Sequence, residues 1–572
     1  MSELELLVKL FPLDHEYKFS VHEVTFKTLP STSTVSTKIS TQNVSVQSLC
    51  EGPEDADHPK PEFAGQRGNG LRYRWYHASQ NNLDWAESLI SKLLPASDVA
   101  RFRRMMSDRE ESIRHVSQMT RSIRLGCESI CREGIYSASS HAAGYNVLEG
   151  KSRHQSAPGT VALFMPFLGW DDASHLCERH KALEMLVSDA VPQSVQEAYA
   201  SVTTHPKRRF KAASVTASKP LQLPSTLDQY QFPSSATSSG FARSSKRLQD
   251  QAVPRRTKHT MTAPKALVVN QLWLFSIGND TVITFFPGCE KPFVSDNKNY
   301  PLEETIKTRL AEIVSPMEAC SDVHSLCTLI IQGAVNLITE TSQSRGFELI
   351  ECYRNSVSSL RQEYMQALAT FRDEALNQSP NSRSLIKADS TWARIFDVST
   401  MLDEILVLQE VYKTQLNVLD TFGTTIWGEN WKDLLFDSSS HRPGLARLFE
   451  TRGKISDFLS NFNTLQASLL HNKADWLNLL DLHEKRASLQ EARSAVKQAE
   501  ETGRQTEASL ALAESAAKQN RVMMIFTFMT VIFVSMTLSS TVIMLTGPGK
   551  SASAFILHIV LLDERSRVFF GP

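Results

Sequence analysis

The pattern of hydrophobic and polar positions changes character along the 572 residues of the chain. Before residue 65, the alternation in FKTLPSTSTVSTKISTQNVSVQSL predicts short strands or disorder. Farther on, GTVALFMPFLGW predicts a buried strand. ALVVNQLWLFSIGNDTVITFFP predicts a β-hairpin that turns at Gly278-Asn279-Asp280, because Gly and Asn tolerate a positive φ.

Helical periodicity surrounds these strands and then replaces them. The segments LDWAESLISKLL and 96–125 predict amphipathic helices, so the first half of the chain mixes helices with strands. After the hairpin the strand pattern disappears, and the sequence predicts helices over 302–341, 345–377 and 383–422. Pro443 and Gly444 open a last helical region, since proline is favoured in the first turn of a helix.

A seven-residue repeat marks the segment from about His471 to Arg521, which contains no Pro and a single Gly. Its members are Leu482, Leu489, Val496, Gly503, Leu510, Ala517 and Met524, with Ala492, Ala499 and Ala513 three positions after a member. Small residues in a heptad predict a long stalk helix packed closely against other helices. Charged residues occupy the remaining positions and face water or neighbouring chains: Glu491, Arg493, Lys497, Glu500, Glu501, Arg504, Glu507 and Lys518.

Residues 522–546 contain no charge, no Pro and no Gly. Twenty-five residues at ~1.5 Å each span roughly 37 Å, enough to cross a hydrocarbon core of about 30 Å, so the stalk continues as a transmembrane helix. At about 100° per residue, one face collects Asn520, Met523, Thr527, Thr530, Val534, Thr537 and Thr541. The sequence leaves two interpretations of this threonine stripe open: a pore wall built by several copies, or hydroxyls that bond their own backbone or a paired helix.

Composition excludes some functions. A net charge of -1 gives no reason to expect nucleic acid as a partner. The eight cysteines have no repeated spacing and are expected to be reduced and intracellular. Cys127 with Cys131, and His175 with Cys177 and His180, lack a second pair at zinc-finger spacing, so we interpret them as ordinary side chains. The N-terminus lacks the form of a signal peptide, which places the bulk of the chain in the cytosol.

Residues 201–265 hold twelve Lys or Arg against two Asp, and six Pro. This composition predicts a basic disordered linker, with attraction to anionic lipid as the alternative. We divide the chain into a polar N-terminal segment, a cytosolic α/β region, the basic linker, a hairpin plus helical region, the stalk helices, a transmembrane helix and a short tail. Their respective bounds are 1–65, 66–200, 201–265, 266–442, 443–521, 522–546 and 547–572.

Several segments resemble one known family. The stalk followed by IFTFMTVIFVSMTLSS resembles the end of the cytosolic domain and the first membrane helix of fungal CorA-like magnesium transporters. Upstream, in the family's order, RWYHASQNNLDWAESLISKLL (74–94), MPFLGW (165–170), STLDQYQF (225–232) and VNQLWLFSIGNDTVITFFP (269–287) are similar to its motifs RWIHLPxNNMxW, MPYLxW, TLDQYYY and VDQLWLWVLDDxTIITxFP.

The resemblance implies an α+β cytosolic domain, a CorA-like funnel of long helices, and a C-terminal transmembrane helix lining the pore of a pentamer. In the family, a Gly-Met-Asn loop that helps to select the hydrated ion and a second membrane helix follow. Here Met544, Leu545 and Thr546 stand at the signature and all three differ, while SASAFILHIVLL (551–562) is too short for a second span. Two explanations remain open: a diverged single-span protein, or a misread gene end after about Thr541.

We therefore expect an integral membrane protein, most of it cytosolic, with the plasma membrane favoured and lipid and further copies of itself as partners. Its expected function is transmembrane transport of magnesium or another divalent cation, with Mg²⁺ as cargo and no cofactor. The alternative is a single-span, membrane-tethered oligomeric interaction protein without transport. An enzyme ranks lowest, since no phosphate loop, nucleophile elbow or metal-ligand spacing occurs. We interpret Asp84 and Asp228, inside the matched motifs, as capping or surface charges.

Overall fold

The structure of the chain is a computed structural model, which describes a defined set of residues. These are 18–29, 34–46, 49, 71–94, 96–115, 118–123, 126–129, 160–172, 221–222, 224–231, 251, 265–287, 302–313, 320, 322–344, 348–376, 384–436 and 442–546. The chain divides into two compact units, Met1–Leu480 and Asp481–Pro572, and each is described by itself. Most of the basic linker, residues 131, 175, 177 and 180, and the tail 547–572 lie outside the described residues.

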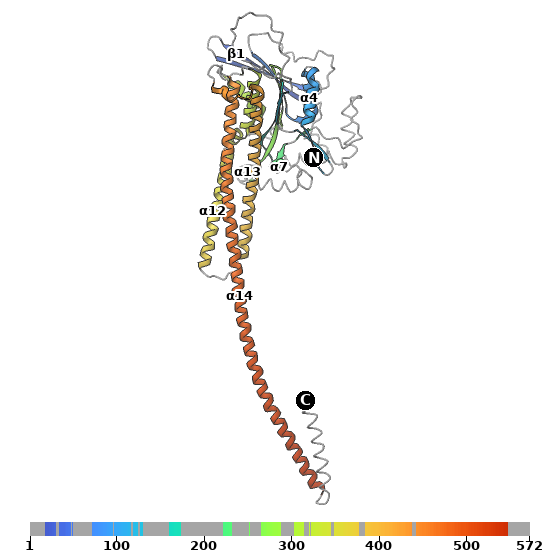
Figure 1. Cartoon of the computed structure of the whole chain (residues 1–572), viewed down its shortest axis with the longest axis vertical. Coiled ribbons are helices and arrows are strands. Elements are labelled where there is room, and N and C mark those ends of the chain that lie inside the picture. Colours follow the sequence, from blue (N-terminus) through green and yellow to red (C-terminus); the bar gives the residue numbers. More distant parts are fainter. Residues whose placement is uncertain are drawn as a thin grey trace, which may run out of the picture. The chain divides into compact units, whose positions relative to one another are not determined.

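A mixed sheet forms the centre of the first unit (Figure 1). Its strands lie in the order β2-β1-β3-β12-β11-β8-β7, and the short β10 pairs with β11 beside this path. All these pairs are antiparallel except β12 with β3, which is parallel. The bounds are β1 Lys18–Leu29, β2 Thr34–Ser45, β3 Leu71–Ala78, β7 Gly126–Ser129, β8 Thr160–Asp172, β10 Ser225–Thr226, β11 Lys265–Ile277 and β12 Thr281–Phe285.

Helices cover both faces of this sheet. On one face, Phe164, Trp273 and Phe285 form a buried cluster with α3 (Leu83–Leu93) and α4 (Ala96–Arg109). The other face packs against a helical layer, whose members are α7 Leu227–Gln231, α10 Leu302–Glu312, α11 Val323–Ser344, α12 Leu349–Leu376, α13 Ser384–Trp427 and the start of α14, Pro443–Thr546. A short 3₁₀ helix, η2 (Asp433–Phe436), follows α13. The first unit is therefore a mixed α/β domain with long helices.

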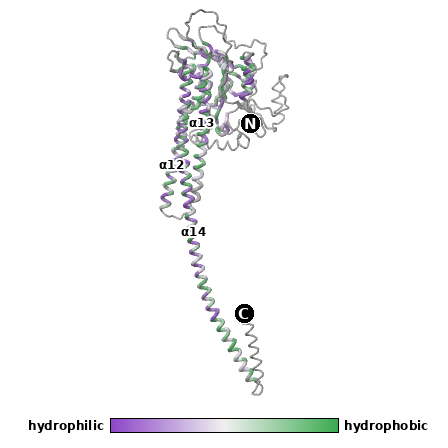
Figure 2. The backbone as a smooth tube through the Cα atoms, viewed as in Figure 1, coloured by the Kyte–Doolittle hydropathy of each residue, from purple (hydrophilic) through white to green (hydrophobic). Residues whose placement is uncertain are grey.

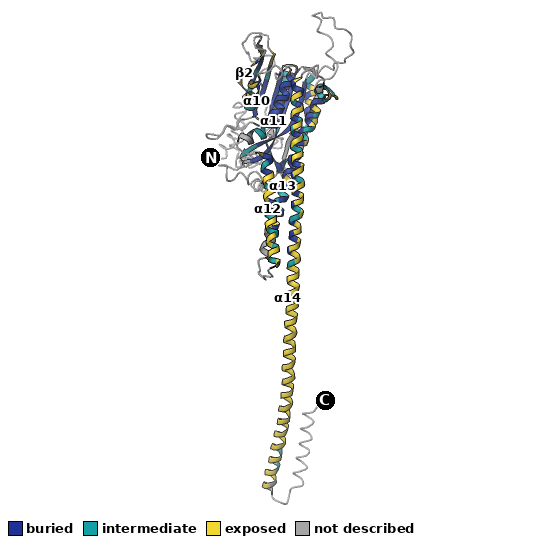
Figure 3. Ribbon diagram, turned by 90° about the vertical axis from the view of Figure 1, so that its left-hand side faces the viewer, coloured by how far each residue is buried: buried dark blue, intermediate teal, exposed yellow. Residues whose placement is uncertain are grey.

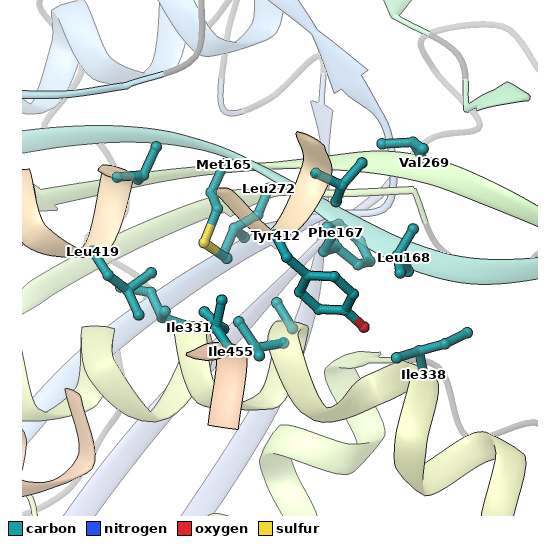
Figure 4. Packing of buried hydrophobic residues seen from close by; sticks show 14 of the residues in the cluster. Met165, Phe167, Leu168, Val269, Leu272, Ile331, Ile338, Tyr412, Leu419 and Ile455 are labelled. Atoms are coloured by element: carbon teal, nitrogen blue, oxygen red, sulfur yellow. The ribbon is translucent and has the colours of Figure 1, made fainter. Parts of the chain in front are cut away.

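The larger core lies between the sheet and the long helices. Figure 4 shows Tyr412 of α13 among Met165 of β8, Leu272 of β11 and Ile331 of α11. A buried hydrogen bond joins the same layers, in which the side-chain amide of Gln415 donates to the carbonyl of Pro166 at 2.8 Å. Apolar burial thus supplies the attraction between the layers, and the amide fixes their register.

Several predicted elements are confirmed and others are corrected. The hairpin forms as β11 and β12, with Gly278 at φ 58 in its turn. The first sixty-five residues contribute two strands of 12 residues each, longer than the short strands expected. The helix predicted over 96–125 is wrong beyond Arg109, because two strands follow that pair with each other: β5 (Glu110–His115) and β6 (Gln118–Ile123). The backbone of both segments is extended, so the helical period expected there does not form.

The helix predicted over 302–341 is two helices, since α10 ends at Glu312 and α11 begins at Val323. Pro316 lies between them, and proline is not tolerated inside a helix. The helix predicted over 383–422 runs on to Trp427 and ends at Gly428, whose φ of 88 is the left-handed conformation that terminates helices.

The four family-like motifs meet in this one domain. MPFLGW lies in β8 and VNQLWLFSIGNDTVITFFP spans β11 and β12, which pair with each other. STLDQYQF supplies β10 and α7, where Thr226 and Gln229 exchange side-chain to backbone hydrogen bonds as a capping box. RWYHASQNNLDW supplies β3, the two-residue β4 (Asn81–Asn82), which pairs with β9 (Leu221–Gln222), and the start of α3. These motifs build the sheet and its connections.

Candidate membrane-spanning site

The helix α14 carries every residue that the sequence places in the membrane or at its filter. It begins at Pro443, as predicted, and ends at Thr546. Its part in the second unit, from Asp481 onward, is continuously helical, so no break separates the heptad segment from the apolar segment. Figure 2 shows purple and white stretches along this part of the helix giving way to a mainly green one toward residue 546.

Among the described residues, α14 is the one helix long and apolar enough to cross a membrane, judged by length and composition. None of its most apolar window is buried within the chain, and Figure 3 shows this part of the helix in the colour of exposed residues. A core helix of a water-soluble domain would be covered by its own fold. The chain is accordingly described as a membrane protein with a large domain outside the apolar helix.

The threonine stripe lies on one exposed face of α14. Each of its four hydroxyls donates to a backbone carbonyl one turn earlier: Thr527 to Met523 at 2.7 Å, Thr530 to Phe526 at 2.7 Å, Thr537 to Phe533 at 2.9 Å, and Thr541 to Thr537. Such bonds satisfy the hydroxyl hydrogen inside lipid. The oxygen keeps its lone pairs, so each threonine still presents a hydrogen-bond acceptor outward.

The remaining stripe residues, Asn520, Met523 and Val534, are exposed on the same helix. Their place in a pore stays a prediction. The residues that the resemblance aligns with the family's signature, Met544, Leu545 and Thr546, end α14, and Met544 and Leu545 are 90 % and 83 % exposed. The resemblance implies a loop there, whereas the backbone remains helical through Thr546.

The heptad residues of the stalk are exposed as well. Leu489, Val496 and Leu510 each expose more than half of their surface, and a Cβ added at Gly503 would meet nothing within 4 Å. Within the part of the chain that the structure describes, these positions have no packing partner. The close packing of the stalk against other helices stays a prediction.

The other described candidate residues, which the sequence singled out as acidic residues inside the motifs or as possible metal ligands, lie in helices or in the buried core. Asn82 rather than Asp84 is the N-cap of α3, since its side-chain oxygen accepts from the backbone N–H groups of Asp84 and Trp85. Asp228 lies within α7. The described cysteines Cys127, Cys320, Cys327 and Cys352 are buried. No group of three or more His, Cys, Asp or Glu among the described residues is arranged to hold a metal ion.

Sequence reasoning missed one polar cluster in the first unit. His22 of β1 and His77 of β3 are buried, and the Glu303 carboxylate of α10 lies between them, 3.0 Å from His22 Nε2 and 3.8 Å from His77 Nε2. These residues are 55 and 226 positions apart in sequence, so no local pattern brings them together. The signal that could have found them is the histidine inside RWYH, which directly follows a Trp and a Tyr on a predominantly buried strand.

Comparisons with known proteins give little beyond this geometry. No family model matches the chain, and no curated protein matches it either. Among solved structures, the cytoplasmic domain of ZntB from Vibrio parahaemolyticus is similar over 70 % of this chain and 88 % of its own, with 9 % sequence identity and a TM-score of 0.22. A likeness of this size supports no conclusion about what the chain transports or binds.

Proposed function

We propose that this chain is one subunit of an oligomeric divalent-cation transporter of the CorA-like kind, with Mg²⁺ as the first cargo to test. In this proposal the α/β domain lies in the cytosol, the plasma membrane is the first candidate location, and several copies of α14 surround a pore. The observation that carries the proposal is an exposed apolar helix, long enough to span a bilayer, with one stripe of threonines.

The chemistry of the stripe suits a hydrated cation. Mg²⁺ loses its waters reluctantly, and those waters point their hydrogens outward. A threonine whose hydrogen is bonded to its own helix offers lone pairs alone, which accept hydrogen bonds from such waters. Back-bonding and a pore-lining role are therefore compatible in this helix. A single helix has no lumen, so the proposal requires copies to assemble, and we take a pentamer from the family resemblance.

The direct test is cation flux in liposomes that contain the purified full chain and an entrapped Mg²⁺-sensitive dye. Thr537→Leu removes a ring of acceptors, one from each copy, and we expect at least about a fivefold loss of flux, because one lost hydrogen bond is worth about 1 kcal/mol. Ser539→Leu is the matched control. Ser539 also bonds its own backbone, at 2.8 Å to Ser535, but lies two residues on and about 200° around the helix.

Three outcomes bear on the proposal. Loss of flux in Thr537→Leu with normal flux in Ser539→Leu supports a pore lined by the stripe. Equal effects of the two variants on flux would contradict a pore lined by the threonine stripe, but would not contradict transport itself. No flux of Mg²⁺, Zn²⁺ or Ni²⁺ from the unmodified chain, in liposomes where crosslinking demonstrates an oligomer, would contradict transport itself.

A second function follows from the helical backbone of Met544, Leu545 and Thr546. These residues occupy the position of the family's ion-selecting loop but continue the helix and lack its Asn amide. The second candidate is therefore a membrane-tethered oligomeric interaction protein, in which the stalk assembles the subunits and the cytosolic domain binds partners. Stable oligomers without cation flux favour this function over transport.

A further inference from the structure

Three helices of the first unit pack on one another in pairs: α12, α13 and the first part of α14 (Figure 1). Tyr353 of α12 donates to the Glu404 carboxylate of α13 at 2.8 Å, and its ring meets that of Phe462 in α14 with the centroids 6.0 Å apart. Gln409 of α13 donates to Asn463 of α14 at 2.9 Å. Three helices that touch in pairs form a triangle, so each of them turns a different face outward.

The outward face of α13 carries large apolar side chains. Trp392 and Phe396 are more than half exposed, and Leu406 and Asp403 are exposed farther along the same helix. At about 100° per residue these four positions fall within an arc of about 80°. We call them the aromatic face. Apolar side chains gathered on an exposed face are typical of an interaction site.

The outward face of α14 carries a second apolar set. Leu470 and Leu477 lie seven residues apart and are exposed, and the half-buried Lys473 lies between them. These three positions fall within an arc of about 60°. We call them the leucine face. All three belong to the first unit, as the aromatic face does.

The two faces lie at the same level along the three helices. Glu363 of α12 accepts from Arg394 of α13 at 2.8 Å, and Arg361, two residues earlier in α12, forms an ion pair with Asp475 of α14. Arg394 and Asp475 are therefore held at nearly the same level by one turn of α12. Arg394 lies between the two aromatic residues of the aromatic face, and Asp475 lies two residues before the end of the leucine face.

Each face also carries one charge, and the two charges are opposite. Among the described residues, neither Asp403 nor Lys473 forms an ion pair. Counted from the contact of Gln409 with Asn463, Asp403 lies about one turn of helix from the level of Lys473, a distance that a lysine side chain spans. The aromatic face and the leucine face are thus complementary in charge as well as in level.

We propose that the aromatic face of one copy docks on the leucine face of the next copy. The inference rests on the proposed function, in which copies assemble around α14. Copies related by rotation about an axis along α14 keep the same level, so faces at equal levels meet. An interface between two different faces closes into a ring. Two aromatic faces paired with each other at equal level would bring Asp403 against Asp403, which repels.

The test is disulfide crosslinking, with copper phenanthroline as oxidant, of full chains reconstituted in liposomes. Chains with Phe396→Cys, co-expressed with chains that carry Leu477→Cys, should give at least about five times more crosslinked dimer than either variant alone, because a disulfide needs Cα atoms within about 7 Å. The unmodified chain measures the background from native cysteines. Both substituted side chains are exposed, so the domain should fold normally.

Met365→Cys is the matched control. Met365 is 54 % exposed, against 59 % for Phe396, but it belongs to α12, the third helix of the triangle. Its chains, co-expressed with Leu477→Cys chains, should stay at the background yield.

A charge reversal tests the orientation of the interface. Asp403→Lys, added to the Phe396→Cys chains, should lower the yield of crosslinked dimer about threefold, because it places two lysines opposite each other. Lys473→Asp, added to the Leu477→Cys chains, should restore the yield. Failure of the second change to restore what the first removes would overturn the pairing of Asp403 with Lys473.

The remaining outcomes separate this interface from the proposed function. Dimers formed by Phe396→Cys chains alone, or equal yields with Met365→Cys, would overturn the pairing of these two faces. An oligomer that an amine-reactive crosslinker demonstrates, without disulfides between Phe396→Cys and Leu477→Cys chains, would overturn the interface and leave the proposed function in place. Absence of any oligomer would overturn both.

Discussion

The chain uses its apolar residues in two opposite ways. In the first unit, Trp273, Phe275 and Leu274 of β11 are almost completely buried between the layers of one domain. In the second unit, residues 522–534 have no buried member at all. These apolar side chains of the first unit are covered by other parts of the same chain. Those of the second unit require lipid or other copies of the chain to cover them.

This difference shows which regions of the molecule find their packing partners within one copy. Fold and local chemistry can be derived for the first unit, because its partners are on the same chain. The second unit presents the exposed faces of one helix, whose partners come from outside the chain. The predictions below test this contrast, from the largest expected effect to the smallest.

The largest effect is expected in the apolar segment. Ile532→Asp combined with Met536→Asp places two charges near its centre, on the face opposite the threonine stripe, at a cost of about 6 kcal/mol of membrane insertion free energy. We expect the chain to leave the membrane fraction in alkaline extraction. The control is Leu489→Asp with Val496→Asp in the stalk, which should stay with the membrane. Retention of the first double variant would contradict a lipid-facing segment.

A core substitution should cost less, and should act on the first unit. Trp273→Ala removes a fully buried indole that contacts Phe164 and Phe285, so we expect the free energy of unfolding to fall by about 4 kcal/mol. Denaturant unfolding followed by circular dichroism measures the loss. Trp392→Ala, at a tryptophan of α13 that is 53 % exposed, is the matched control and should change stability by less than about 1 kcal/mol.

Acid should destabilise the first unit through His77. Its folded pKa of about 4 lies below the ordinary 6.5, so the unfolded chain binds the proton more tightly. Stability is therefore complete above pH 6.5 and falls by about 3 kcal/mol as the pH approaches 4. Unfolding free energies measured at several pH values should show this slope, and His77→Gln should flatten it. A flat curve for the unmodified chain would mean that His77 titrates normally in the folded state.

The smallest effect on stability is expected in the stalk. Leu489→Ala with Val496→Ala should change the unfolding free energy of the first unit by less than about 0.5 kcal/mol, because both side chains are exposed. The same change should lower the yield of crosslinked oligomers, if the heptad face is where copies meet. Leu274→Ala, at a fully buried position, should lower the free energy of unfolding of the domain and leave the yield of crosslinked oligomers unchanged. An unchanged crosslinking yield would place the interface elsewhere.

Sequence reasoning succeeded where the pattern is local. The β11–β12 hairpin was predictable, because a Gly-Asn-Asp turn and two apolar runs lie within twenty-two residues. It failed over 110–123, where a helical period was assumed but β5 and β6 pair with each other. For the candidate site, the threonine stripe was visible as a helical repeat, and the bonds of its hydroxyls to the backbone were among the two alternatives foreseen.

The motifs illustrate the same limit. Their order along the chain indicated a family, but not that MPFLGW and VNQLWLFSIGNDTVITFFP would be neighbouring strands of one sheet. Gly169 shows the reason: a Cβ there would lie 2.5 Å from the side-chain nitrogen of Asn270, a contact made across paired strands. The glycine is explained by a residue 101 positions away, which no local pattern contains.

By itself, the sequence determined the elements whose signal is periodic and continuous: a long C-terminal helix, its uncharged segment of twenty-five residues, and the stripe along one face. Periodicity suffices there because a helix depends on neighbours three and four residues away. Only the tertiary structure decided the order of the strands and the meeting of His22, His77 and Glu303. Those contacts join distant segments, and long-range burial rather than local propensity selects them.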